Sequence, residues 1–145
     1  MVSKKSGSAD STRRPRRAES SARKFNDDGV QFGIASDSQA YTLRELTVAL
    51  QGNGLDLSMF DAALRFWSFD NGFSKPDPHV FRILSARLEA RGIQPAEILM
   101  VGDRLDNDIE PARAHGWQTW QLVATKRPGR LGNWHDLSAW LESNG

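Results

Sequence analysis

Three carboxylates follow a short apolar run in MVGDRLDND, residues 100–108. Asp103 and Asp108 flank a four-residue turn that also contains Asp106. Carboxylates this close repel one another unless a cation or several N–H donors compensate their charge. Mg²⁺ typically takes one or two carboxylates together with waters and a substrate phosphate. Helix capping by Asp106 is the alternative, but it explains one acid and not three. The stretch therefore favours a metal site with Asp103 and Asp108 as ligands.

Two further segments carry residues suited to holding an anion. GFSKPDPHVF, residues 72–81, places Lys75 just before an Asp-Pro helix start. Lys75 is either a solvated loop lysine or a cation that holds an anionic substrate. ASDS, residues 35–38, places the Ser36 hydroxyl and backbone N–H groups at the junction of a strand and a helix, where anions bind readily. Taken alone, ASDS is better explained as an ordinary Ser or Asp N-cap.

The apolar pattern predicts which elements position these residues. Buried strands are expected at 31–36, 62–69, 97–102 and 117–123, each an apolar run bounded by turn residues. Helices are expected over Leu43, Leu46 and Leu50, from the Asp77-Pro78 start to Gly92, over 106–116, and around Leu137, Trp140 and Leu141. Strands that alternate with helices predict an α/β sandwich with a mostly parallel sheet. Ligands bind beyond the carboxyl ends of such strands, so Ser36, Lys75 and Asp103 are expected to converge at one edge.

The overall composition is typical of one globular domain. The chain has 145 residues, 39% of them hydrophobic, and a net charge of +1, which gives no argument for nucleic-acid binding. It contains no cysteine, which excludes disulfides and thiolate metal sites. It shows no apolar run that could span a bilayer and no secretory leader, so a cytoplasmic protein without membrane contact is expected. The oligomeric state is not indicated.

The charge is unevenly distributed along the chain. Residues 1–31 hold eight Lys or Arg and four acids, with many serines and few apolar side chains. Such a segment cannot offset its ordering entropy, so residues 1–30 are predicted to be a disordered basic tail preceding a domain at 31–145. Its RRPRR stretch could contact phosphate backbones, but a solvated tail is the favoured interpretation.

Taken in order, the three motifs resemble those of the haloacid dehalogenase (HAD) superfamily of hydrolases, over about residues 31–123. GIASDS resembles the second family motif, GFSKPDPHVF the third, and VGDRLDNDIEPARAHGW the fourth, G-D-x-x-x-x-D. The resemblance implies a HAD-like, Rossmann-like core. It also implies that Ser36, Asp37 and Lys75 bind the substrate phosphate, with Ser36 and Lys75 catalytic, and that Asp103 and Asp108 bind Mg²⁺. The implied activity is a Mg²⁺-dependent phosphatase of small phosphorylated metabolites. Dehalogenase activity is less favoured than phosphatase activity, because dehalogenase chemistry has no need of the metal-binding acids.

The first family motif has no counterpart in the sequence. Family members begin with a strand carrying Asp-x-Asp, whose first Asp attacks phosphorus to form an aspartyl-phosphate. No apolar strand and no such pair precede Gln31, and no cap domain is present. The missing strand lies at the centre of the family sheet, so its absence leaves a gap of about 10 Å, two inter-strand spacings.

Three explanations for the missing motif remain open. The chain is truncated, it is a non-catalytic phosphate-, Mg²⁺- or partner-binding module with a basic tail, or another chain supplies the strand. Truncation is favoured because the remaining motifs keep every expected polar residue. The chain as given is expected to be inactive. The substrate is not indicated, because cap residues usually select it.

Overall fold

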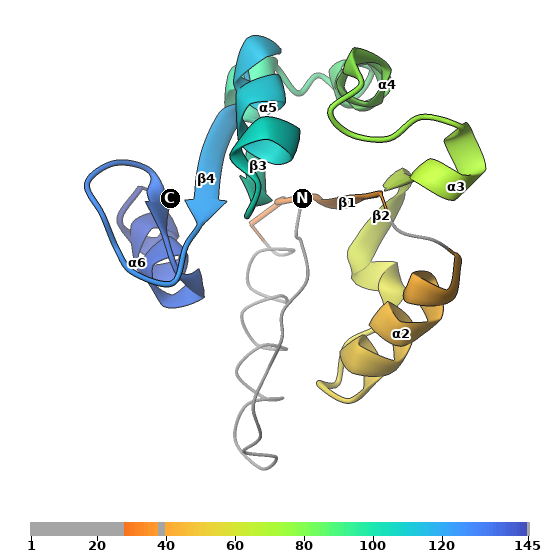
Figure 1. Ribbon diagram of the computed structural model, residues 1–145, viewed down its shortest axis with the longest axis horizontal. Coiled ribbons are helices and arrows are strands. Elements are labelled where there is room, and N and C mark those ends of the chain that lie inside the picture. The colour runs from red at the N-terminus through yellow and green to blue at the C-terminus, as the bar shows by residue number, and fades with distance from the viewer. Residues whose placement is uncertain (1–27, 38–39, 145) are drawn as a thin grey trace. The chain divides into compact units, whose positions relative to one another are not determined.

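The computed structural model describes residues 28–37 and 40–144, which divide into two compact units, 28–72 and 73–144. Each unit is described by itself (Figure 1). Nearly all of the predicted basic tail, residues 1–27, lies outside the described residues. The prediction that this tail is disordered therefore stays a prediction.

The unit at 28–72 is built on two parallel strands. Strand β1 (Phe32–Ser36) pairs with β2 (Phe60–Trp67), and helix α2 (Ala40–Gln51) connects them in sequence, followed by a 3₁₀ turn at Leu57–Met59. The core side chains of this unit include Ile34, Leu64 and Phe66. The predicted strand at 62–69 begins earlier and ends at Trp67, because residues 68–71 form the short helix α3 (Ser68–Asn71). The Asn71 amide donates to the Trp67 carbonyl oxygen and closes that turn.

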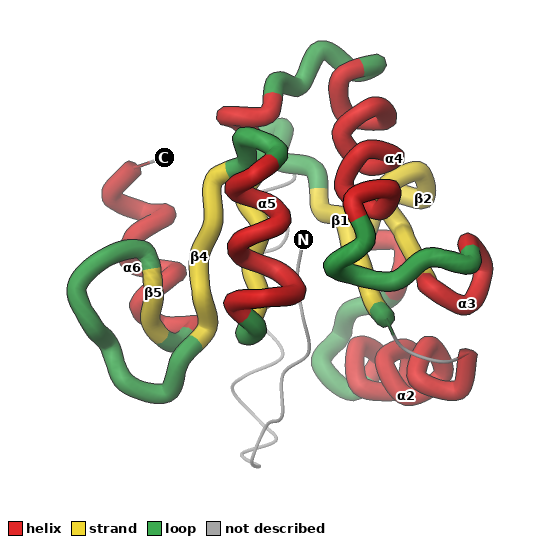
Figure 2. The backbone as a smooth tube through the Cα atoms, turned by 45° about the horizontal axis from the view of Figure 1, so that its top comes forward, coloured by secondary structure: helices red, strands yellow, loops and turns green. Residues whose placement is uncertain are grey.

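The unit at 73–144 contains a three-stranded parallel sheet in the order β3-β4-β5. Its elements are α4 (Pro78–Glu89), a 3₁₀ turn (Pro95–Glu97), β3 (Leu99–Gly102), a π-helical turn η3 (Leu105–Ile109), α5 (Glu110–Ala114), β4 (Gln118–Leu122), β5 (Leu131–Gly132) and α6 (Trp134–Asn144). Figure 2 shows β5 beside β4, as their pairing requires. The sequence did not predict β5, because two residues are too few to show a strand pattern. The predicted helix at 106–116 is divided between η3 and α5.

Helices cover both faces of this three-stranded sheet. On one face, α6 packs Leu137, Trp134 and Trp140 against Val101 of β3 and Trp120 of β4. The opposite face is covered by α5, whose Arg113 donates through Nε to the buried Thr119 hydroxyl. Helix α4 joins the same side, since the Phe81 ring contacts the rings of His115 and Trp117. The layers are helix, sheet and helix, which confirms the predicted α/β sandwich with parallel strands.

The parallel strands form two separate ladders. Strand β1 pairs with β2, while β3 pairs with β4, and no ladder joins β1 with β3 among the described strands. Each ladder therefore lies within one of the two units.

Capping residues and glycines set the ends of the helices. Helix α4 begins at Pro78 because Asp77 caps it, accepting from the His79 N–H at 2.8 Å, as the Asp-Pro sequence predicts. Helix α2 ends at Gln51, just before Gly52. These two helices are 12 residues long, and no helix in the described part of the chain is both long and apolar enough to cross a membrane.

Candidate functional site

The turn that follows β3 brings an acidic residue back to the strand end. Asp103 comes directly after Gly102, and the chain then enters η3. The Asp108 N–H donates to the Arg104 carbonyl oxygen at 2.9 Å, and the Ile109 N–H reaches the same oxygen at 3.3 Å. The second bond is the wider ring of a π-helix, a geometry often found at functional sites. The turn places the Asp108 side chain against the Gly102 backbone, where a Cβ on residue 102 would come within 2.5 Å of Asp108 Cγ.

Asp108 is a buried carboxylate paired with Lys75. One of its oxygens accepts from the Lys75 ammonium, and the other accepts from the Arg104 backbone N–H at 3.2 Å. The Lys75 side chain is 8% exposed and the Asp108 side chain 4% exposed. Burying two charges is costly, so such a pair persists only where geometry and further hydrogen bonds compensate for lost hydration. Lys75 is therefore not the solvated loop lysine considered from the sequence.

The other two acids of the cluster are exposed. Asp106 accepts from the Arg104 guanidinium at 2.9 and 3.3 Å, and the side-chain hydrogen bond from Arg104 lowers the pKa of the Asp106 carboxyl. The capping role considered for Asp106 is wrong, because the turn begins at Arg104 without any side-chain cap. Asp103 follows the strand end as an exposed residue. Among the three acids, Asp103 is thus the one placed to meet a ligand from solvent without breaking an ion pair.

The acids that the structure places here suit a hard cation only in part. No group of three His, Cys, Asp or Glu residues that could hold a metal ion occurs among residues 28–37 and 40–144. Asp103 and Asp108 supply two carboxylates, which fits Mg²⁺ because this ion completes its shell with water and substrate phosphate. Asp108 already has the Lys75 ammonium as its counter-ion, so Asp103 is the more accessible of the two oxygen ligands.

The loop that carries Lys75 is held at both ends. The Asp77 N–H donates to the Ser74 carbonyl oxygen at 2.9 Å, and the Asp77 carboxylate caps α4. The backbone N–H of His79, followed by its side chain, lowers the pKa of Asp77. The Phe73 and His79 rings stack with centroids 4.9 Å apart and planes 11° apart. The sequence analysis identified Asp77 as a cap and missed the ring contact, for which a spacing of six residues gives no periodic signal.

The remaining predicted site residues belong to the other unit. Ser36 is the last residue of β1 and is half-buried, and Asp37 follows it as an exposed residue. Residues 38 and 39 of the ASDS segment lie outside the described residues, so its alternative role as the cap of α2 stays open. Lys75 and Asp108 are brought together, whereas the convergence of Ser36 with them stays a prediction.

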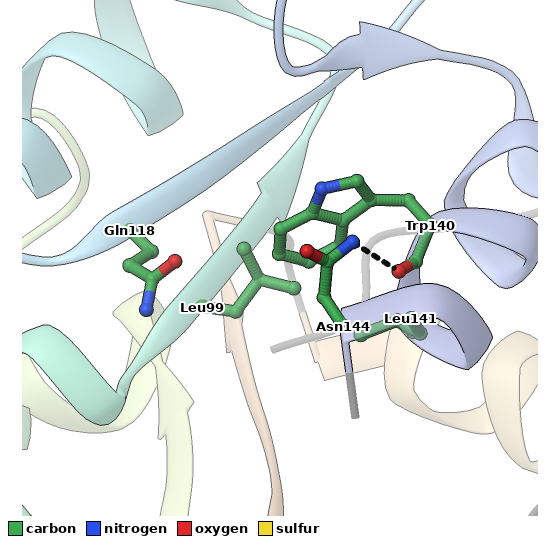
Figure 3. A pocket seen from close by; sticks show the side chains of 5 residues that line it. All are labelled: Leu99, Gln118, Trp140, Leu141 and Asn144. Carbon is green, nitrogen blue, oxygen red and sulfur yellow. Dashed lines mark hydrogen bonds between the residues drawn. The ribbon is translucent and has the colours of Figure 1, made fainter.

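A pocket of about 170 Å³ lies away from these residues (Figure 3). It is lined by Leu99 and Gln118, the first residues of β3 and β4, and by Trp140, Leu141 and Asn144 of α6. It therefore opens at the amino ends of the parallel strands, whereas Asp103 follows a carboxyl end. The Gln118 amide already has partners, since its oxygen accepts from Arg130 and its nitrogen donates to the Ala96 carbonyl oxygen. The Lys75–Asp108 pair is the better candidate site.

The segment that carries the paired lysine and aspartate also has similarity to known proteins. Residues 72–130 match the family model described as HAD-hydrolase-like, a segment that contains Lys75, Asp103 and Asp108. None of the curated proteins matches the chain significantly. The match covers less than half of the chain, so it shows that residues 72–130 are similar to HAD-like hydrolases.

Solved structures of HAD proteins share the fold. A HAD phosphatase from Thermococcus onnurineus superposes with a TM-score of 0.63 at 25% identity, over 84% of this chain and 55% of its own. The magnesium-bound YfnB of Bacillus subtilis, assigned to the HAD hydrolases, gives a TM-score of 0.66 at 21% identity, over 86% and 53%. A HAD family hydrolase from Deinococcus radiodurans R1 with bound phosphate and sodium gives 0.61 at 21%, over 87% and 58%. The chain thus spans little more than half the length of these proteins.

Proposed function

We propose that this chain forms the phosphate- and Mg²⁺-binding part of a HAD-type phosphatase that acts on small phosphorylated metabolites. The observation that carries the proposal is the buried Lys75–Asp108 pair beside the carboxyl end of β3. The buried ammonium of Lys75 offers positive charge for a phosphoryl group, and the exposed Asp103 that follows β3 offers an oxygen ligand for a cation. The phosphatase and the phosphate- and magnesium-bound proteins described above support this choice of ligands.

Each residue has a distinct role in this proposal. Lys75 offsets negative charge on the phosphoryl oxygens, and Asp108 holds its ammonium in place. Ser36 and the backbone beside Asp37 donate hydrogen bonds to the same oxygens at the end of β1. Asp103 and Asp108 hold Mg²⁺, which when bound supplies further neutralisation of the phosphoryl charge. All of these groups bind or stabilise the phosphoryl group, and none of them attacks phosphorus.

The first test measures turnover and phosphate binding together. We expect no hydrolysis of a generic aryl phosphate, because the sequence holds no counterpart of the family's attacking Asp. Inorganic phosphate is expected to bind in the presence of Mg²⁺, and Lys75→Met is expected to abolish detectable binding, as measured by isothermal titration calorimetry. Mg²⁺-dependent hydrolysis that disappears in Asp103→Ala would overturn the claim that the nucleophile is missing. Phosphate that fails to bind the wild-type chain at any Mg²⁺ concentration would overturn the proposed function.

The second test asks whether the missing strand is all that catalysis lacks. Residues 1–30 are replaced by an apolar strand ending in Asp-x-Asp, and the matched control carries Asn at the first of these two positions. The proposal expects Mg²⁺-dependent aryl phosphate hydrolysis in the first chimaera and none in the control. Equal activity in both chimaeras, or phosphate binding without turnover in both, would favour a non-catalytic phosphate-binding module over a phosphatase.

A further inference from the structure

A second set of side chains lies around Lys75, on its own loop. Phe73 precedes Lys75 by two residues, and Asp77 and His79 follow it by two and four. The Phe73 ring stacks on the His79 ring, and the Asp77 carboxylate lies 2.7 Å from His79 Nδ1 while also accepting from the His79 N–H. These three residues, which we call the 73–79 clasp, join the two ends of the loop that presents Lys75.

The clasp is fixed to the core through α4. His79 is the second residue of this helix, whose Val80, Phe81 and Leu84 side chains are at most 1% exposed. Asp77 holds the imidazole by the same oxygen that caps the helix, which orients the ring face toward Phe73. The Phe73 end of the loop is thus tied to a helix that cannot shift without disturbing the core.

The clasp and the ion pair have opposite exposure. The His79 side chain is 55% exposed and that of Asp77 38% exposed, whereas the Lys75 ammonium is buried against Asp108. An exposed ring stack contributes little to the core, yet it closes the loop in which Lys75 holds a buried charge. Phe73 is itself 37% exposed, so core packing does not explain its contact with His79.

We propose that Phe73 and His79 are positioning residues that hold Lys75 against Asp108 through the 73–79 clasp, with Asp77 orienting the imidazole. This role rests on the proposed function for its purpose, because it prepares Lys75 to receive a phosphoryl group. The existence of the clasp as a holding device can be tested without any phosphate. The His79 ring face matters in this proposal, and its capacity to carry a proton does not.

The test measures the acylation rate of each lysine in the full chain by acetic anhydride and mass spectrometry. Lys126 serves as the internal reference, because its side chain is 71% exposed. His79→Ala and Phe73→Ala are each expected to raise Lys75 acylation relative to Lys126 by about two- to tenfold, the range that an aromatic pair supplies. The double variant is expected to match the single ones, since either change breaks the same contact.

Two further variants distinguish positioning from loss of structure. His79→Phe keeps a stacking ring and is expected to restore acylation to the wild-type rate. His135→Ala is the matched control, because His135 is also an exposed second helical residue whose N–H donates to a capping side chain, that of Asn133. It is expected to leave Lys75 acylation unchanged.

Three results would overturn the inference. These are unchanged Lys75 acylation in His79→Ala, a His79→Phe variant that behaves like His79→Ala, and an equal effect of His135→Ala. Phosphate titrations of the same variants separate the two proposals. Faster Lys75 acylation in a chain that never binds phosphate would remove the proposed function and keep the clasp. Normal phosphate binding with unchanged acylation in His79→Ala would remove the clasp and keep the proposed function.

Discussion

The ends of strands β1 and β3 carry predicted site residues in two different units, and they are built differently. Beyond β3, the η3 turn returns Asp108 to the strand, where Lys75 and the Arg104 N–H satisfy its carboxylate. Beyond β1, half-buried Ser36 and exposed Asp37 lead toward α2 without a comparable buried charge. The β3 end therefore holds a buried carboxylate whose counter-ion, Lys75, comes from the loop before α4. The β1 end contributes a hydroxyl and backbone groups, which cost little to expose when no ligand is bound.

This difference leads us to expect that substitutions at the β3 end mainly change stability and that substitutions at the β1 end mainly change binding. Asp108→Ala gives the largest expected effect. It removes the carboxylate that pairs with the buried Lys75 ammonium, and breaking a buried ion pair in this way typically costs about 3 to 5 kcal/mol. Urea unfolding followed by tryptophan fluorescence measures the loss. Asp106→Ala is the control, because it breaks an ion pair that is exposed on both sides and is expected to change little. Equal effects of the two substitutions would contradict the comparison.

Gly102→Ala is expected to have the next largest effect. The added Cβ would come within 2.5 Å of Asp108 Cγ, so the η3 turn has to move away from β3. Overpacking of this kind costs about 1 to 3 kcal/mol, and it should also loosen Lys75. Gly52→Ala beyond α2 is the matched control, since the contacts closest to its added Cβ are at 3.5 and 3.7 Å. The measurement compares the unfolding midpoints of the two variants in urea. A Gly102→Ala midpoint equal to that of Gly52→Ala would show that the close packing is not required.

Ser36→Ala tests the β1 end of the comparison. A hydroxyl at a half-buried strand end is worth about 1 kcal/mol or less to stability, even when it is hydrogen-bonded. The same substitution should weaken binding of inorganic phosphate by about tenfold, the value of one hydrogen bond to a charged group. Urea unfolding and calorimetric titration of one preparation give both quantities. A Ser36→Ala chain that loses as much stability as Asp108→Ala would erase the distinction between the two strand ends.

Much of this architecture could be predicted from the sequence, for identifiable reasons. The apolar run around Ile34 and the Asp77-Pro78 start are local signals, and β1 and α4 lie where they predict. The strand predicted at 62–69 ends two residues early, because its last two residues belong to the short helix α3, which a hydrogen bond from Asn71 closes. These two residues are apolar or neutral, so their types do not indicate the end of the strand. The strand β5 is set by its pairing with Gln121 and Leu122, which no local pattern in Leu131 and Gly132 reveals.

The site was predictable in its residue types and less so in its contacts. The order of the motifs pointed to Lys75, Asp103 and Asp108 together. Asp103 is exposed, whereas Asp108 is buried in a pair with Lys75. This difference depends on the π-helical turn η3, which holds about one residue more than a turn of α-helix. The signal available in the sequence was Gly102, whose missing side chain leaves room for Asp108.

The smallest expected effect concerns pH, and it tests whether the Lys75 loop depends on the charge of its cap. Hydrogen bonds from His79 lower the pKa of Asp77 below 3.8, so the folded state favours the carboxylate. A lowered pKa adds stability above the unfolded value, and this contribution is lost as the pH falls through the folded value. Asp77→Asn keeps a good capping side chain but removes the charge. The difference in unfolding temperature between wild type and Asp77→Asn should thus be constant from pH 7 to about pH 5 and shrink below about pH 4. A difference that grows in acid would mean that the folded state does not favour the Asp77 carboxylate.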